Sequence, residues 1–361
     1  MAPALCYIDA MSRFKLSSAP AIALTSAALF GASTPFAKLM LGDGLDAWML
    51  AGLLYLGSGL GLAAVWMLRK DRQDEVRLVR KDWGWMGLVV LAGGVAGPVL
   101  LMIGLASTPA STAALLLNVE GLATMGIAWL VLREHVDRRL LVGALAILTG
   151  ALILSWRGGA GSIGWSSLAI VGACIAWGID NNLTRKLSGS DPVQIAMVKG
   201  LAAGSGNLTL GLASGAHLPG LTTLACAGLV GFLGYGVSLV LFVLALRHLG
   251  SARTGAYFSS APFIGALIAI GLLGDPVTLR LIAAAMLMII GLYLHLAESH
   301  DHSHVHEPLE HAHAHVHDEH HRHEHASDAP PGEPHSHAHV HVRLVHAHPH
   351  YPDLHHRHGH G

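Results

Sequence analysis

Residues 108–134 of the chain read TPASTAALLLNVEGLATMGIAWLVLRE, and residues 249–275 read LGSARTGAYFSSAPFIGALIAIGLLGD. The two stretches align without gaps, and they end in the acidic residues Glu134 and Asp275. In both copies a Gly follows the acidic residue 16 positions later. Matching ends in a matching order predict an internal repeat that covers much of the chain.

A second pair of stretches extends the likeness toward the N-terminus. FGASTPFAK (30–38) aligns with WGIDNNLTR (177–185), since each has an aromatic residue, then Gly, then a cation seven residues after that Gly. Small and apolar residues align by chance in many membrane proteins, and that alternative is strong for a short match. It does not account for two pairs of stretches in the same order.

The composition places most of the chain in a membrane. Of 361 residues, 52% are apolar and only 12% are charged, whereas soluble proteins carry about 25% charged residues. Charge this scarce cannot cover the surface of a soluble body, so a soluble enzyme is excluded. No basic stripe is present, which argues against a nucleic-acid partner.

Continuous apolar runs of about 20 residues are long enough to cross a bilayer as helices. The expected spans are 19–41, 46–68, 84–105, 110–132, 139–156, 165–186, 192–213, 221–246, 252–273 and 278–297. The first run continues through about residue 41, which favours an uncleaved span over a signal peptide.

Five spans in each copy have a topological consequence. An odd number places the second copy in the opposite orientation, so the sequence predicts two inverted repeats with a site between them near the membrane midplane. The predicted fold is an all-α integral membrane protein of ten transmembrane helices. Its predicted parts are an N-terminal segment (1–18), two five-helix repeats (19–156 and 164–297) and a His-rich tail (298–361).

Lys and Arg indicate the orientation. With the N-terminus inside, the inner segments hold 15 Lys and Arg residues and the outer connections hold two, Arg157 and Arg280. Ten spans return the chain to the inner side. We therefore expect a multi-pass protein of the inner (plasma) membrane with both termini in the cytoplasm.

The sequence resembles the EamA-type members of the drug/metabolite transporter superfamily. The resemblance rests on FGASTPFAK (30–38) and on LLLNVEGLATMGIAWLVLREHVDRRLLVGALAILTGALIL across the fourth and fifth expected spans. It covers about 19–297 in two copies and implies ten helices, inverted repeats and transport of small solutes. The second copy departs from the pattern with Gly274-Asp275-Pro276 where Glu is usual.

Ionisable and amide side chains inside the spans are costly to bury and are therefore functional candidates. The candidates for a substrate path are Glu120, Lys199, Asp180, Asn181, Asn118 and Lys38. Glu120 could bind a proton or cation, and Lys199 could bind an anionic group. The alternatives are a structural ion pair for Glu120 and Lys199, and snorkelling to the interface for Lys38.

The tail has a different composition, because 23 of the 27 His lie between His300 and His360. Neutral imidazole is a good ligand for nickel, cobalt, zinc and copper, so we expect the tail to bind these metals without any required cofactor. The expected ligands include His300, His302, His304, His306, His311, His313, His315, His317, His335, His337, His339 and His341. Low apolar content and Pro residues predict a disordered tail. A regular strand is an alternative, since alternation also suits an extended chain.

Two functions remain open at this point. The first is a secondary transporter of small organic solutes with a metal-binding tail, and the second is a dedicated transporter of nickel, cobalt, zinc or copper ions that the tail feeds or senses. No nucleophile–base pair, nucleotide loop or ATP-binding motif is present, so we expect no enzyme activity. The expected partners are the lipid bilayer and a small-molecule or metal-ion substrate, with a homodimer possible.

Overall fold

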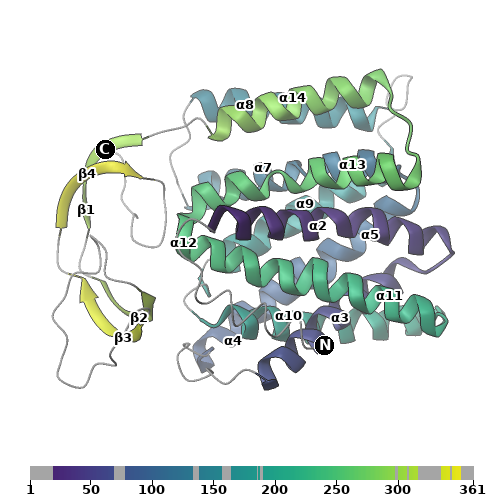
Figure 1. The fold of residues 1–361 in the computed structure, drawn as a ribbon, viewed down its shortest axis with the longest axis horizontal. Coiled ribbons are helices and arrows are strands. Elements are labelled where there is room, and N and C mark those ends of the chain that lie inside the picture. Colours follow the sequence, from purple (N-terminus) through teal and green to yellow (C-terminus); the bar gives the residue numbers. More distant parts are fainter. Residues whose placement is uncertain are drawn as a thin grey trace.

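The structure is a computed structural model that describes residues 19–68, 78–132, 138–156, 164–184, 186–187, 190–296, 300–306, 309–315, 335–341 and 344–350. The predicted N-terminal segment (1–18) and His317 lie outside the described residues. The described body is helical, and the described tail consists of short strands (Figure 1).

The helices of the first half follow the expected spans closely. They are α2 (Ala19–Gly42), α3 (Ala47–Leu68), η2 (Arg80–Asp82), α4 (Trp83–Val89), η3 (Val90–Ala96), α5 (Gly97–Ala106), α6 (Ala110–Leu116), α7 (Val119–Leu132) and α8 (Arg138–Ser155). The segment η3 is a π-helix between α4 and α5, so the third expected span is one continuous helical stretch with a wider turn in its middle.

The helices of the second half are α9 (Trp165–Thr184), α10 (Pro192–Ala213), α11 (Leu221–Gly231), η4 (Phe232–Val237), α12 (Ser238–Phe258), α13 (Ala261–Leu273) and α14 (Leu279–Leu296). The segment η4 is also a π-helix. The apolar stretch Leu221–Ala245 agrees with the eighth expected span. The helix α12 nevertheless continues to Phe258, so the helix break expected between the eighth and ninth spans is absent there. Residues 247–258 contain no Pro, and the chain breaks instead at Ser259–Ser260, just before Pro262.

Six of the helical stretches are long and apolar enough to cross a membrane: Ala19–Gly42, Ala47–Leu68, Arg80–Ala106, Ala110–Val131, Arg138–Ser155 and Leu221–Ala245. Two shorter apolar helices are Ala261–Leu273 and Leu279–His295. The remaining long helices of the body, α9 and α10, carry more polar residues, and these residues form the site described below.

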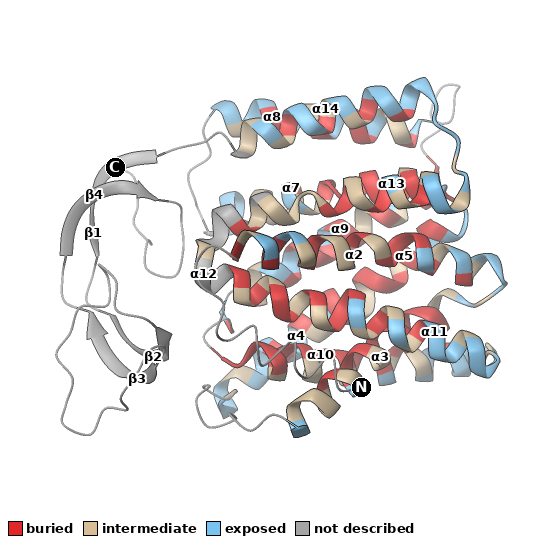
Figure 2. Cartoon of the chain, in the orientation of Figure 1, coloured by how far each residue is buried: buried red, intermediate tan, exposed pale blue. Residues whose placement is uncertain are grey.

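The helices pack in pairs that join the two halves. Helix α3 lies against α10, α8 against α14, and α2 against α12 and α13, while α9 packs on α5 and α7. The pair α8 and α14 forms one edge of the body, at the top of Figure 1, and much of its outer surface is exposed (Figure 2). Small residues allow close contact, since a Cβ on Gly200 of α10 would lie 2.6 Å from the backbone nitrogen of Gly59 in α3.

The described part of the tail contains four strands, β1 (His300–His306), β2 (Leu309–His315), β3 (His335–His341) and β4 (Leu344–His350). Strand β1 pairs with β4 and β2 with β3, both antiparallel. These four segments have the extended conformation that the sequence offers as the alternative to disorder. Their His residues alternate with other residues, which is the period of an extended strand.

Candidate substrate-path site

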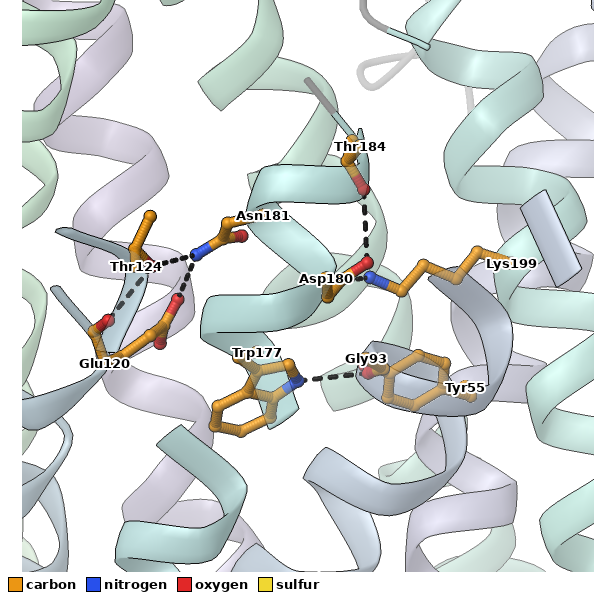
Figure 3. Close-up of polar contacts among 9 residues, drawn as sticks. All are labelled: Tyr55, Gly93, Glu120, Thr124, Trp177, Asp180, Asn181, Thr184 and Lys199. Carbon is orange, nitrogen blue, oxygen red and sulfur yellow. Dashed lines mark hydrogen bonds and ion pairs between the residues drawn. The ribbon is translucent and has the colours of Figure 1, made fainter. Parts of the chain in front are cut away.

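Helix α9 presents polar side chains in two directions within the body. Asp180 faces Lys199 of α10, whereas Asn181, the next residue, faces Glu120 of α7 (Figure 3). Successive residues of an α-helix point about 100° apart, so neighbours in sequence serve two different partners. Helix α9 of the second half therefore takes part in two polar groups, one around Asp180 and one around Glu120.

The first group is a buried ion pair. The Nζ atom of Lys199 donates to Oδ2 of Asp180, and the two side chains are only 10% and 6% exposed. Thr184, one turn further along α9, donates from Oγ1 to Oδ1 of Asp180 at 3.1 Å. Both carboxylate oxygens therefore have a partner, which a buried charge requires.

The second group joins the two halves through an amide. Asn181 donates from Nδ2 to Oε1 of Glu120 at 3.0 Å and to Oγ1 of Thr124 at 3.2 Å. Thr124 in turn donates to the backbone carbonyl of Glu120 at 3.0 Å. Glu120 is half-buried and Asn181 is exposed, so this carboxylate is more open than that of Asp180.

The π-helix η3 supplies carbonyl oxygens to the same region. The carbonyl of Gly93 accepts hydrogen bonds from Tyr55 Oη at 2.7 Å and from Trp177 Nε1 at 3.0 Å (Figure 3). The next carbonyl, that of Gly94, accepts from Nδ2 of Asn207 at 2.9 Å. A π-helical turn disturbs the regular hydrogen-bond ladder, and such turns are frequent at functional sites.

The absence of a side chain at Gly93 makes room for Asp180. A Cβ atom at this position would lie 2.6 Å from Cβ of Asp180, and it would overlap the carboxylate. Only Gly allows this close approach between η3 and α9. Gly93 therefore positions the ion pair as well as accepting two hydrogen bonds.

Aromatic side chains from both halves adjoin the site. The rings of Phe30 and Trp177 lie 6.3 Å apart, and those of Tyr55 and Tyr235 lie 5.4 Å apart. Phe30 also contacts Tyr235 at 5.9 Å between ring centroids. The polar groups thus border an apolar, aromatic region at the contact between the halves.

Four of the six predicted path residues come together: Glu120, Asp180, Asn181 and Lys199. The ion pair forms between Lys199 and Asp180, and Glu120 bonds to Asn181 instead. Asn118 lies at the break between α6 and α7, where it donates to the carbonyl of Leu115 at 2.8 Å. The same carbonyl also accepts from the backbone N–H of Asn118 at 3.1 Å, so the side chain reinforces the turn between the two helices.

Lys38 also has a different position from the cluster. Its Nζ atom donates to the carbonyls of Leu105 at 2.7 Å and Ala106 at 3.0 Å, at the C-terminal end of α5. A cation at a helix C-terminus satisfies carbonyls that have no partner within the helix. This geometry accounts for Lys38 without placing it beside the other candidates.

Several residues of the site were missed by the sequence reasoning: Tyr55, Gly93, Thr124, Trp177 and Thr184. Trp177 and Tyr55 resemble ordinary core aromatics in apolar helices. Gly93-Gly94 gave a usable signal, because adjacent glycines in a helix are typical of a close approach or an irregular turn.

A polar site enclosed by helices that are apolar enough to cross a bilayer defines a membrane transport protein. The chain matches the EamA-like transporter family over residues 17–156 and again over 164–297, so it belongs to that family. The family predicted from the sequence is therefore confirmed, and the chain is a transporter rather than an enzyme.

The comparisons found related proteins of known sequence and structure. The chain is 27% identical over 288 residues to a protein named uncharacterized transporter from Methanothermobacter thermautotrophicus (strain Delta H), covering 75% of this chain and 83% of that protein. A crystal structure described only as that of a protein has a TM-score of 0.58 at 17% identity, over 77% of this chain and 96% of the other. This structure shows likeness of fold alone.

Proposed function

We propose that this EamA-family protein is a secondary transporter of the plasma membrane, which moves small solutes by alternating access between two inverted five-helix halves. The observation that carries the proposal is the hydrogen bond between Glu120 of the first half and Asn181 of the second. Protonation or ligand binding at Glu120 would change this contact between the halves. Alternating access requires such a change.

The positions of the π-helices support two equivalent halves. The aligned stretches beginning at 108 and 249 differ by 141 residues. Adding 141 to η3 (90–96) gives 231–237, and η4 occupies 232–237. An irregular turn at the same place in both copies is expected of a true repeat.

The helix contacts support the same arrangement. In the aligned repeats α2 corresponds to α9, and α5 corresponds to the region of α12. The contact of α2 with α12 therefore matches the contact of α9 with α5. Likewise the contact of α2 with α13 matches that of α9 with α7. Exchange of the two halves thus preserves these two contacts.

The proposed orientation places both termini in the cytoplasm, as the 15 inner and two outer Lys and Arg residues favour. Energy would come from an ion gradient, with protons acting through Glu120. The tail would bind divalent transition metals in the cytoplasm, and a homodimer is compatible with this arrangement.

Uptake into proteoliposomes tests the proposal. Purified protein would be assayed with labelled amino acids, aromatic organic anions and cationic drugs under an imposed proton gradient. We expect gradient-driven uptake of at least one compound, and we expect Glu120→Gln to lose it while remaining folded. The control Asp43→Asn removes a carboxylate from an exposed connection and should transport normally. Gradient-driven uptake that persists in Glu120→Gln would contradict the proposed role of Glu120.

A second candidate is a transporter of nickel, cobalt, zinc or copper ions, which the His-rich tail favours. Among the side chains that the structure describes, no group of three or more His, Cys, Asp or Glu residues is placed to hold a metal. Metal content of cells that lack the protein decides between the candidates. Altered metal content would support the second, whereas unchanged content with an altered drug or amino-acid phenotype would support the first.

A further inference from the structure

We propose that Asp180 competes with a transported anion for Lys199, so that one proton binds Asp180 when one anion binds Lys199. The inference rests on the proposed transport function and names its substrate class, a small organic anion with an apolar or aromatic body. Before binding, the pair is Asp⁻ with Lys⁺. Afterwards it is neutral Asp with Lys⁺ and the anion, so the net charge of the occupied site does not change.

The first support is the bonding of Lys199. An ammonium group has three donors, and the acceptor found for it among the described residues is Asp180. An incoming carboxylate or sulfonate would first contact the remaining donors, and its charge would then replace that of Asp180 as the partner of Lys199. Protonated Asp180 would keep a hydrogen-bond partner, because Thr184 donates to its other carboxyl oxygen.

The second support comes from the equivalent position in the first half. The offset of 147 residues between the aligned stretches at 30 and 177 pairs Ser33 with Asp180. A Cβ on Gly234 of η4 would meet Cβ of Ser33 at 2.7 Å, just as one on Gly93 of η3 would meet Cβ of Asp180 at 2.6 Å. Gly234 therefore packs against the neutral side chain of Ser33 as Gly93 packs against Asp180. The fold therefore does not require a carboxylate there, which favours a functional role for Asp180.

The third support is the apolar surface beside the pair. Tyr55 and Trp177 bond to the carbonyl of Gly93, the residue against which Asp180 packs. Phe30 and Tyr235 extend this aromatic region toward the other half. An anion with an apolar ring could place its charge at Lys199 and its ring among these side chains.

Other ionisable groups near the pair must be separated from Asp180 in any test. Glu120 on α7 is held by the neighbouring residue Asn181, Tyr55 comes from α3, Tyr235 from η4, and Cys174 lies on α9 itself. The described elements α4, η3, α5 and α6, which also pack on α9, contain no ionisable residue. Glu120 is the other carboxylate among these groups, so it needs its own variant.

Calorimetric titration with benzenesulfonate tests the inference on the full-length protein in detergent. This sulfonate stays charged at all working pH values, so any pH dependence belongs to the protein. Between about pH 8 and about pH 5.5 we expect affinity to rise by up to about tenfold per pH unit, as uptake of one proton requires. Asp180→Asn should bind tightly with no pH dependence, Lys199→Met should not bind, and Glu120→Gln should keep the pH dependence.

The double variant Asp180→Ser/Lys199→Met removes both charges of the ion pair. It shows whether loss of binding comes from loss of Lys199 or from loss of folding. Replacing both partners of a buried pair is often tolerated, so we expect normal thermal unfolding without benzenesulfonate binding. The inference is wrong if wild-type binding does not change with pH, if the pH dependence survives in Asp180→Asn, or if Lys199→Met or the double variant binds. If the inference is wrong but gradient-driven uptake still depends on Glu120, the proposed transporter function stands. If benzenesulfonate binds as expected but no compound is taken up, the transporter function is contradicted and the inference about binding stands.

Discussion

At the scale of single residues, Gly93 has two roles that both depend on its small size. Its carbonyl accepts hydrogen bonds from Tyr55 and Trp177, and its missing side chain leaves space for Asp180. A change at Gly93 therefore acts on the ion pair without touching either charged residue. This makes Gly93 a direct test of how tightly the pair is positioned.

We expect Gly93→Ala to destabilise the protein by about 1–3 kcal/mol, the usual cost of forcing extra volume into a packed interior. It should also reduce transport, because the new Cβ would displace Asp180 from Lys199. Thermal unfolding in detergent and uptake into proteoliposomes measure the two effects. The control is Gly87→Ala in α4, where an added Cβ meets nothing within 4 Å. Equal behaviour of the two variants would show that Asp180 does not pack as tightly as described.

At the scale of elements, the π-helices η3 and η4 are the main departures from regular helix in the body. In η3 three side chains from α3, α9 and α10 bond to two consecutive carbonyls. These bonds hold the wide turn in place from three sides. Because the donors come from both halves, the turn lies at a hydrogen-bonded contact between them.

Removing the donors to Gly93 should have a non-additive effect. Tyr55→Phe alone leaves one donor on the carbonyl, so it should cost about 0.5–1.5 kcal/mol. Trp177→Phe also leaves one donor, but it removes buried ring volume and should cost more. The double variant leaves a buried carbonyl without a partner, and its cost should exceed the sum of the two. Unfolding measurements on the three variants check this. Tyr293→Phe on the exposed surface of α14 is the matched control and should be neutral. Strictly additive costs would mean that the two hydrogen bonds act independently.

At the scale of the whole molecule, the chain combines an apolar body with a tail of different chemistry. The body matches the EamA-like family through residue 297, and the His-rich segment begins directly after it. All six residues named as path candidates lie in the body. We therefore propose that truncation separates transport from the proposed metal binding.

We expect deletion of residues 298–361 to leave a folded protein that still transports its organic substrate. Nickel binding should fall sharply, because 23 of the 27 His are removed. Calorimetric titration with nickel and uptake into proteoliposomes measure the two properties on the same preparation. A complete loss of transport would instead make the tail part of the substrate path and would favour the metal-transport candidate.

The sequence by itself determined the helical membrane class, the family and four of the residues at the site. Apolar runs define spans because each buried backbone group must be satisfied within the helix. Glu120, Asp180, Asn181 and Lys199 were found because polar groups in such runs are expensive and therefore stand out. The continuation of α12 to Phe258 was not predicted, since local pattern alone does not decide between competing breaks. For the same reason the sequence left both disorder and an extended strand open for the tail.

Only the tertiary structure decided which groups meet. Lys199 and Asp180 lie on different helices, and their pairing depends on how closely α9, α10 and η3 approach one another. Gly93 permits that approach, while Lys38 is directed instead to the end of α5. The physical reason is that spacing along a helix fixes the direction of a side chain, whereas its partner is fixed by the packing of other helices.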